Sequence, residues 1–235
     1  MTASSDRPFL QSDPIAALLA AARRSVQEGL NLGSSGNLSV RLPVGFLVTP
    51  SGGALECLRP DDLVVMDPSG GHPQGQTPSS EWRIHADLYR ARPDISAVVH
   101  THSVHAAALA SHGRPIPPFH YMVAVAGGVD IPCAPYATFG TQELSDQALR
   151  ALEHRTACLL AHHGVLAVGA TPTAALNLAL EVEHLARMYL AACQLGEPPL
   201  LDETQMQQVI ERFRHYGADA ACARDAAANA AATES

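Results

Sequence analysis

Two histidines separated by one residue, His100 and His102, have the spacing in this chain most suited to chemistry. Alternate residues of a β-strand project from the same face, so both imidazoles could bind one metal ion. A catalytic zinc ion typically takes three protein ligands, so this interpretation needs at least one further donor. His162 and His163 stand in a predicted turn and could supply it, and because adjacent strand residues face opposite ways we expect only one to bind. The spacing alone is equally compatible with polar or core histidines that bind no metal.

Glu81 is the second chemical candidate, and it follows two serines, Ser79 and Ser80, at the start of a predicted helix. An acidic residue in a first helical turn often does no more than interact favourably with the helix dipole. Free backbone N–H groups and hydroxyls at such a helix start also form an anion site, which would place a phosphate beside the carboxylate. The alternative for the serines is simple capping. His85 lies one helical turn after Glu81. Its position favours a histidine packed in the core over one that acts indirectly at the site.

Two glycine-rich segments, residues 33–37 (GSSGN) and 49–53 (TPSGG), lie a short predicted hairpin apart. Small residues let backbone N–H groups approach an oxyanion closely, although neither segment is a Walker loop or a dinucleotide-binding fingerprint. Turn formation alone would explain each segment. Only together with Ser79 and Ser80 do they predict a phosphate-binding site.

Helices and strands alternate along the chain, and their boundaries are marked by capping and turn residues. Asp13 and Pro14 open the first helix, Thr171 and Pro172 the longest one, and Asp202 with Gln205 suggests a capping box for a last helix. The predicted helices span residues 14–28, 78–92, 104–111 with Ser103 as the N-cap, 141–154 and 172–195. The predicted strands span residues 38–42, 46–49, 63–66, 95–100, 157–161 and 165–168. This order predicts one layered α/β domain that begins with a small antiparallel meander.

The composition is that of a folded globular protein, with 235 residues, of which 47% are hydrophobic and 16% charged. A formal net charge of −8 provides no overall positive field for nucleic acid or for an anionic membrane surface, so neither is an expected partner. No apolar run approaches the roughly 18 residues that a membrane span needs, and the N-terminus lacks the pattern of a signal peptide. We therefore expect a cytoplasmic protein.

The five cysteines are odd in number, widely spaced and contain no CxxC pair. This usage predicts buried, apolar thiols in a reducing compartment and no disulfide framework. The cysteines are Cys57, Cys133, Cys158, Cys193 and Cys222.

Seven segments, taken together and in this order, resemble the class II aldolase and adducin N-terminal domain family. They read SSGNLSVR, VTPSGG, SSEWRIH, AVVHTHSVHA, HYMVAVAGG, IPCAPYATFGT and LLAHHGVLAVG. Within the family they are most similar to the L-fuculose-1-phosphate aldolases. The resemblance, which runs from the first helix to about Gly217, implies a single three-layer α/β domain over residues 1–217, with a mainly antiparallel central sheet flanked by helices. The Ala-rich residues 218–235 are expected to be a disordered tail.

The activity implied by the resemblance is that of a zinc-dependent aldolase, with Mn²⁺ or Co²⁺ as alternative ions. Such an enzyme cleaves a ketose 1-phosphate reversibly to dihydroxyacetone phosphate and an aldehyde. The substrate would be L-fuculose 1-phosphate or a 5-deoxy- or 5-methylthio-ribulose 1-phosphate. These sugars differ by small groups, and an apolar pocket discriminates only weakly between groups of such similar size, so the sequence does not identify the substrate. The resemblance also implies a homotetramer with active sites between subunits.

Site residues are carried over from the family by motif position. His100, His102 and His163 resemble the zinc ligands, and Glu81 resembles the acid/base that also binds zinc when substrate is absent. Tyr121 resembles a tyrosine donated by a neighbouring subunit, which would handle the proton of the departing aldehyde oxygen. The phosphate-binding positions match Gly36, Asn37, Ser51, Gly52, Ser79 and Ser80. The positions that orient the aldehyde match Phe139, Phe213 and Tyr216.

Related functions on the same fold remain open at this point. Pentulose-5-phosphate 4-epimerases usually carry an aspartate at the position of Glu81, which favours an aldolase here. Methylthioribulose-1-phosphate dehydratases and sugar-acid phosphate decarboxylases share the metal site, although the HYM and YATFGT segments favour an aldolase. A non-catalytic, adducin-like interaction module would lack the complete set of three histidines and Glu81.

Overall fold

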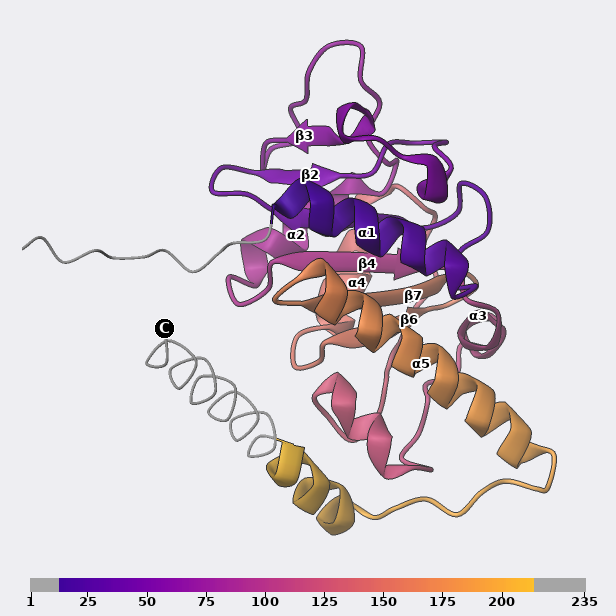
Figure 1. Ribbon diagram of the computed structural model, residues 1–235. Helices are drawn as coiled ribbons and strands as arrows, with labels where there is room; N and C mark the ends of the chain where they lie inside the picture. Colours follow the sequence, from indigo (N-terminus) through magenta and orange to yellow (C-terminus); the bar gives the residue numbers. More distant parts are fainter. Residues whose placement is uncertain (1–12, 214–235) are drawn as a thin grey trace, which may run out of the picture.

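A computed structural model describes residues 13–213 of the chain (Figure 1). The predictions for Tyr216, Cys222 and the tail at 218–235 lie outside these residues. The centre of the fold is one sheet of seven strands in the order β3-β2-β1-β4-β7-β6-β5. All neighbouring strands pair antiparallel except β5 and β6, which are parallel, so the predicted mainly antiparallel sheet is confirmed. The strands are β1 (Asn37–Arg41), β2 (Phe46–Val48), β3 (Val64–Met66), β4 (Ala97–Thr101), β5 (Cys133–Ala134), β6 (Ala157–Leu160) and β7 (Gly164–Gly169).

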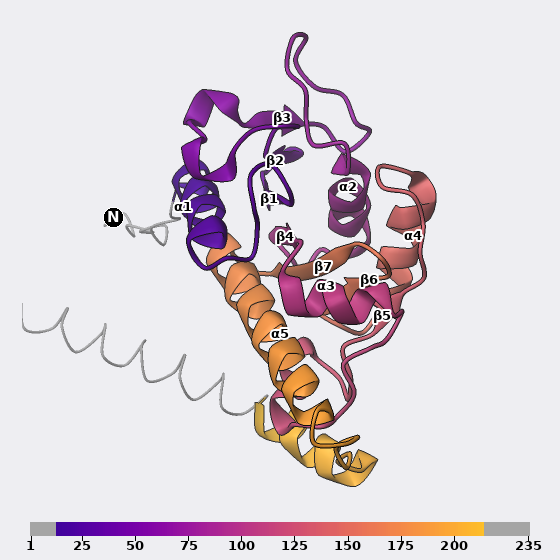
Figure 2. The same cartoon turned by 90° about the vertical axis from the view of Figure 1, so that its right-hand side faces the viewer.

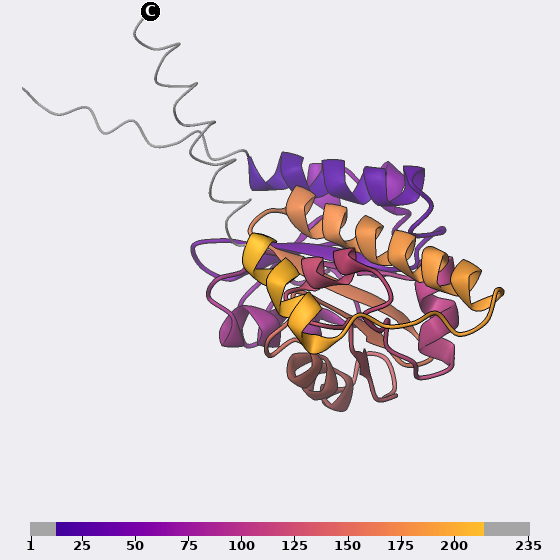
Figure 3. The same ribbon diagram turned by 90° about the horizontal axis from the view of Figure 1, so that it is seen from below.

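Helices cover both faces of the sheet, which gives the three layers expected from the resemblance (Figure 2). One layer holds α1, α3 and α5, and α1 and α5 lie side by side across the sheet (Figure 3). The opposite layer holds α2 and α4. The helices are α1 (Pro14–Gln27), α2 (Trp82–Ala91), α3 (Val104–Ser111), α4 (Gln142–Ala151) and α5 (Pro172–Cys193), with the short 3-10 helices η1 (Leu55–Cys57), η2 (Pro60–Asp62) and η3 (Tyr121–Ala126).

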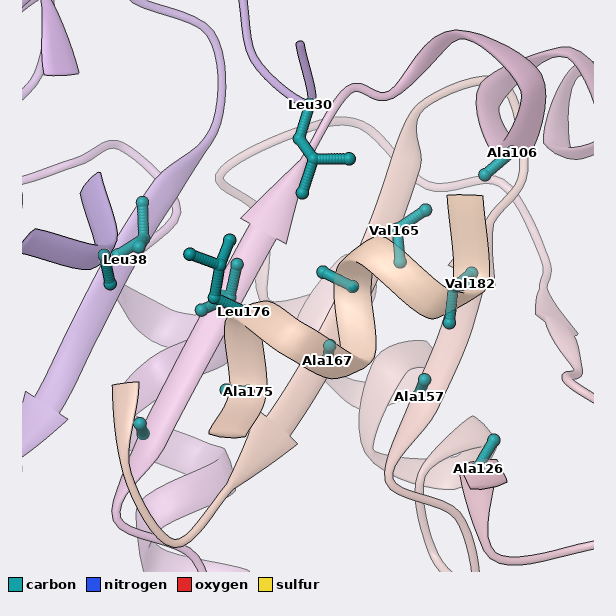
Figure 4. Packing of buried hydrophobic residues seen from close by; sticks show 14 of the residues in the cluster. Leu30, Leu38, Ala106, Ala126, Ala157, Val165, Ala167, Ala175, Leu176 and Val182 are labelled. Atoms are coloured by element: carbon teal, nitrogen blue, oxygen red, sulfur yellow. The ribbon is translucent and has the colours of Figure 1, made fainter. Parts of the chain in front are cut away.

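The two apolar cores follow the alternation of side chains along the central strands. In β4, Val99 packs toward α5, while Val98 packs toward α2. In β7, Val165 and Ala167 face the same core as α5, where Leu176 and Val182 cover them (Figure 4). Alternate residues of a strand share a face, so His100, two positions after Val98 in β4, also faces the side of the sheet that α2 covers.

The second helix begins later than the sequence predicts. It starts at Trp82 with Glu81 at its N-cap, whereas the prediction began it at residue 78. Residues 77–79 instead pair with the loop after β2: Ser51 N–H donates to the carbonyl of Thr77 over 3.0 Å, and Ser79 N–H donates to that of Thr49 over 3.1 Å. This pairing, which local capping signals could not reveal, holds the serine segment beside the glycine-rich loop.

Helix α3 is capped by a distant residue. Ser103 occupies the predicted N-cap but makes no capping hydrogen bond. The carboxylate of Glu183, on α5, instead accepts the N–H groups of His105 and Ala106 at 3.0 and 2.9 Å. The helix that follows the His100–His102 segment is thereby tied to the longest helix of the fold.

The predicted capping box at the last helix is present. Asp202 N–H donates to Gln205 Oε1 over 2.9 Å, and Gln205 N–H donates back to Asp202 Oδ1 over 2.8 Å, at the start of a helix over residues 203–213. Among the described residues, no helix combines the length and apolar character needed to cross a membrane.

The cysteines within residues 13–213 are all free thiols, as expected, but they are not all buried. Cys158 is buried, Cys133 and Cys193 are half-buried, and Cys57 is exposed. The expectation of a buried thiol was therefore wrong for Cys57, the last residue of the 3-10 helix η1.

Candidate metal centre and active-site pocket

Three imidazoles converge at one end of the central sheet. His100 and His102 come from β4 and the residue following it, and His163 comes from the turn between β6 and β7. Their ring centroids lie 4.7 to 5.0 Å apart, and the Nε2 atoms of His100 and His102 are 2.9 Å apart. One ligand nitrogen from each ring lies within 4.8 Å of the others, a spacing that suits a shared metal ion.

The turn that delivers His163 has a backbone that few residues adopt. His162 lies in the left-handed region with φ 55°, which is uncommon for a residue with a side chain and is often found at functional sites. Gly164 follows, and a Cβ there would lie 2.2 Å from the carbonyl oxygen of Thr101. The turn therefore needs glycine at 164 to pack against β4, which brings His163 close to His102.

His100 is oriented by the strand beside it. Its ring is completely buried, and Nδ1–H donates to the carbonyl of Val165 over 2.9 Å. That hydrogen bond selects the tautomer with an unprotonated Nε2, the atom that faces the other two histidines.

Glu81 completes the cluster from the start of α2. Its Oε2 lies 3.2 Å from His100 Nε2, and its Oε1 lies 3.5 Å from His163 Nε2. Asn37 Nδ2 donates to Oε2 over 2.9 Å, whereas Oε1 is buried and has no hydrogen-bond partner within the described part of the chain. Burial alone would raise the pKa of this carboxyl, but His100, His163 and Asn37 together hold it well below its usual range.

The histidines differ in how their surroundings affect protonation. Burial, followed by repulsion from His100, lowers the pKa of His102 and of His163 to about 4, so both rings are neutral near pH 7. Burial also disfavours a proton on His100, but the adjacent Glu81 carboxylate outweighs this and raises the pKa of His100. Neutral imidazoles are the form that binds metal.

The donor set fits a divalent metal ion. Three imidazole nitrogens and one carboxylate are a set that zinc accepts in four-coordinate sites. Such an ion would explain the buried Oε1 of Glu81, to which no residue of the described range donates a hydrogen bond, since buried polar atoms in proteins almost always have a partner. His100, His102, His163 and Glu81 could therefore hold the ion.

A pocket lies directly beside this cluster. The residues singled out from the sequence that line it are Gly36, Asn37, Ser51, Gly52, Ser79, Ser80, Glu81, His102, Phe139 and His163. The lining residues that were not assigned a binding role are Ser34, Ser35, Pro50, Tyr136, Ala137 and His162. Glycines and serines make up a wall of this pocket, and Gly36 and Gly52 there have φ of 75° and 73°. Such a wall offers neutral hydrogen-bond donors to an anion.

Other predicted residues lie apart from this pocket. Tyr121 is on η3, is 48% exposed and does not line the pocket. Phe213 packs against the core that contains α5. The resemblance assigns Tyr121 to a neighbouring subunit's site, so its distance from the pocket of its own chain does not test that role.

One supporting residue, Asn31, was missed from the sequence. It is buried, its Oδ1 accepts the backbone N–H of His102 at 3.1 Å, and its Nδ2 lies 3.3 Å from Ser25 Oγ. A Cβ on Gly36 would lie only 2.3 Å from Asn31 Oδ1, so the glycine loop packs tightly on this amide. No local signal marks Asn31, because its partner is 71 residues away in the chain.

Comparisons with known proteins agree with this geometry. Residues 16–190 match the family model for the class II aldolase and adducin N-terminal domain. The chain is 53% identical over 203 residues to the 5-methylthioribulose-1-phosphate/5-deoxyribulose-1-phosphate aldolase of Rhodospirillum rubrum, covering 86% of this chain and 92% of that protein. It is 49% identical over 190 residues to the L-fuculose phosphate aldolase of Escherichia coli K12, covering 80% of this chain and 88% of that protein.

Solved structures show the same relationship in three dimensions. A structure of L-fuculose 1-phosphate aldolase superimposes with a TM-score of 0.83 at 40% identity, covering 88% of this chain and 98% of that one. The L-fuculose-1-phosphate aldolase from Thermus thermophilus gives a TM-score of 0.69 at 30% identity, covering 79% and 98% of the two chains. This chain therefore belongs to the class II aldolase and adducin N-terminal domain family.

Proposed function

We propose that this protein is a zinc-dependent aldolase that cleaves a ketose 1-phosphate reversibly to dihydroxyacetone phosphate and an aldehyde. Its assignment as a lyase rests on the aldolase relatives at about half identity. The observation that carries the proposal is one pocket lined both by His102, His163 and Glu81 of the candidate metal cluster and by glycines and serines of the two predicted phosphate-binding segments. A metal and a phosphate could thus be held at the two ends of one small substrate.

The chemistry of the basic residues supports a metal mechanism. All fifteen basic residues are arginines, and the sequence contains no lysine. An aldolase that works through a Schiff base requires a lysine amine, so that route is closed to this chain. A divalent ion on the histidines would supply a Lewis acid for the substrate carbonyl instead.

Glu81 is the group we assign to proton transfer. It is buried beside the histidines, and its Oε1 has no hydrogen-bond partner among residues 13–213. A carboxylate placed in this way can hold a proton at Oε1 and return it to the carbon of the three-carbon product. The Asn37 amide keeps the other oxygen, Oε2, in place.

The phosphate group is assigned to the glycine and serine wall. Gly36, Ser51, Gly52, Ser79 and Ser80 line the pocket together with Asn37. None of the described lining residues is an arginine, so binding would depend on neutral N–H and hydroxyl donors. Contacts there are remote from the bond that breaks, and they would orient it.

The remaining roles concern the aldehyde and the assembly. Phe139 lines the pocket and is proposed to orient the aldehyde, together with Phe213 and Tyr216. Tyr121, exposed on η3, is proposed to donate its hydroxyl to the pocket of a neighbouring subunit in a homotetramer. We further propose a cytoplasmic location and a single catalytic domain over residues 1–217.

The direct test is a coupled assay for dihydroxyacetone phosphate. It uses L-fuculose 1-phosphate, 5-deoxyribulose 1-phosphate and 5-methylthioribulose 1-phosphate, before and after chelation and again after Zn²⁺ is restored. We expect one of the three to be cleaved, activity to be lost with the metal, and Zn²⁺ to restore it. Cleavage that survives complete metal removal would refute the mechanism.

A matched variant tests the role of Glu81. Glu81→Gln should keep most of the bound zinc through the three histidines but lose about 10²-fold or more in turnover, the size of a typical general acid–base contribution. Full activity in this variant would refute the assignment.

Other outcomes of the assay would favour the alternative functions. Dehydration, epimerisation or decarboxylation without any dihydroxyacetone phosphate would favour the related enzymes of this fold. A protein without bound metal and without any of these activities would favour the adducin-like module.

A further inference from the structure

A buried chain of hydrogen bonds leads away from Glu81 into the interior. It passes from Glu81 Oε2 to Asn37 Nδ2 over 2.9 Å, and from Asn37 Oδ1 to His85 Nε2 over 2.6 Å. It continues from His85 Nδ1 to Ser39 Oγ over 2.6 Å and from Ser39 Oγ to Tyr89 OH over 2.7 Å. All five residues are buried, and they alternate between α2 with its N-cap, Glu81, and β1.

Only one direction of donation satisfies every link of this chain. An ionised carboxylate can only accept, so the Asn37 amide nitrogen must face Glu81 and its carbonyl oxygen must face His85. That oxygen also accepts, so His85 must carry its proton on Nε2. Burial lowers the pKa of His85 to about 3, so the ring is neutral and its Nδ1 accepts from the Ser39 hydroxyl. The Tyr89 hydroxyl then donates to Ser39 Oγ.

We infer that His85 is a positioning residue for the acid/base Glu81, acting through the amide of Asn37. This inference rests on the proposed function of Glu81. By donating from Nε2, His85 prevents the Asn37 amide from turning over, because the reversed amide would place two acceptors together at Glu81 and two donors together at His85. Asn37 thus holds Glu81 Oε2, and Oε1 is left as the oxygen that carries the proton.

The geometry distinguishes this role from ordinary core packing. A packing role would require only the volume of the His85 ring, whereas the chain of hydrogen bonds requires a donor at the position of Nε2. The same arrangement leaves one Nδ2 hydrogen of Asn37 uncommitted to Glu81, so that the residue can still serve the pocket it lines.

The test compares two substitutions that differ in that donor. His85→Leu fills the space without a donor, and His85→Gln keeps an N–H near the position of Nε2. In the zinc-loaded enzyme, we expect His85→Leu to lower kcat by about tenfold or more, with KM and bound zinc nearly unchanged, while His85→Gln stays within about threefold of the original kcat. His154→Leu, at an exposed histidine after α4, is the control for loss of an imidazole elsewhere.

Two outcomes would overturn the inference. One is a normal kcat in His85→Leu, and the other is an equal loss in both variants, because the retained donor would then rescue nothing. Glu81→Gln is measured in parallel. If this variant keeps full turnover, the proposed role of Glu81 fails, and the NMR measurement of the His85 tautomer then decides whether the hydrogen-bond chain has the inferred direction.

Nitrogen NMR of the unaltered protein shows the tautomer of His85 directly, without reference to activity. We expect the His85 signals of the neutral tautomer protonated at Nε2 throughout the range from about pH 6 to 8. Ser39→Ala, which removes the donor to Nδ1, should shift the Nδ1 signal while leaving the Nε2 proton in place. A His85 ring protonated at Nδ1 would overturn the inference whatever the kinetics show.

Discussion

The side chain of Asn31 is hydrogen bonded to the main chain of His102, with Oδ1 accepting the N–H at 3.1 Å. This contact joins the segment after α1 to the end of β4, where two of the three clustered histidines stand. The loop that carries Gly36 packs on the same amide. The proposed metal ligands and the proposed phosphate loop therefore share one buried support.

Replacement of that support should weaken both the fold and the metal site. Asn31→Leu leaves the partly buried N–H of His102 without its acceptor, and we expect the free energy of unfolding to fall by about 1–3 kcal/mol. Asn31→Asp keeps an acceptor oxygen and is the matched control. Denaturant unfolding and the zinc content after dialysis measure the two effects, and equal stability of Asn31→Leu and the original protein would contradict the role.

Substitutions at two glycines can distinguish the stability cost of a left-handed backbone from the cost of a collision with Asn31. Gly33 and Gly36 have φ of 63° and 75°, but only at Gly36 would a Cβ collide with a neighbouring side chain. Gly33→Ala should cost about 1–2 kcal/mol of stability for the left-handed backbone alone. Gly36→Ala should cost more, and it should also raise KM for the phosphorylated substrate. Equal losses in the two variants would show that the close approach to Asn31 has no energetic consequence.

Removal of one clustered imidazole tests the metal centre itself. His102→Ala leaves two imidazoles and Glu81, the carboxylate that we propose for proton transfer, so we expect weaker binding of zinc, loss of the ion on dialysis, and loss of aldolase activity. Metal analysis of the purified protein is the measurement, with His154→Ala as a control at an exposed histidine. Full zinc content in His102→Ala would place the ion elsewhere.

The buried His85 predicts how stability depends on pH. Burial, with a smaller contribution from His100, lowers its pKa from 6.5 to about 3 despite the opposing attraction of Glu81. The unfolded chain therefore binds a proton at this residue below about pH 6.5 that the folded protein does not, and stability is lost as the pH falls through this window. The effect approaches about 1.4 kcal/mol per pH unit for one such group.

Denaturant unfolding of the metal-free protein between about pH 7 and pH 4 measures this effect. His85→Gln cannot bind the proton in either state, so its stability should fall less steeply with decreasing pH than that of the original protein. Parallel curves for the two proteins would show that His85 does not contribute to the acid dependence.

Local patterns in the sequence were sufficient for much of the fold. Asp13 with Pro14, and Thr171 with Pro172, mark helix starts that the structure confirms, because a cap acts within one turn of its own helix. The alternation along β4 and β7 shows which residues share a face, since side-chain direction in a strand has period two. The spacing of His100 and His102 predicted their convergence for the same reason.

What only the tertiary structure decided depends on contacts between distant segments. Residues 77–79 pair with the loop after β2, so α2 begins at Trp82 and not at residue 78. Glu183 caps α3, and Asn31 supports His102, across more than seventy residues of chain. Such partners leave no periodic or capping signal, because each hydrogen bond exists only after the sheet has brought its two segments together. The same holds for the chain from Glu81 to Tyr89, whose direction is set by which atom of each neighbour must accept.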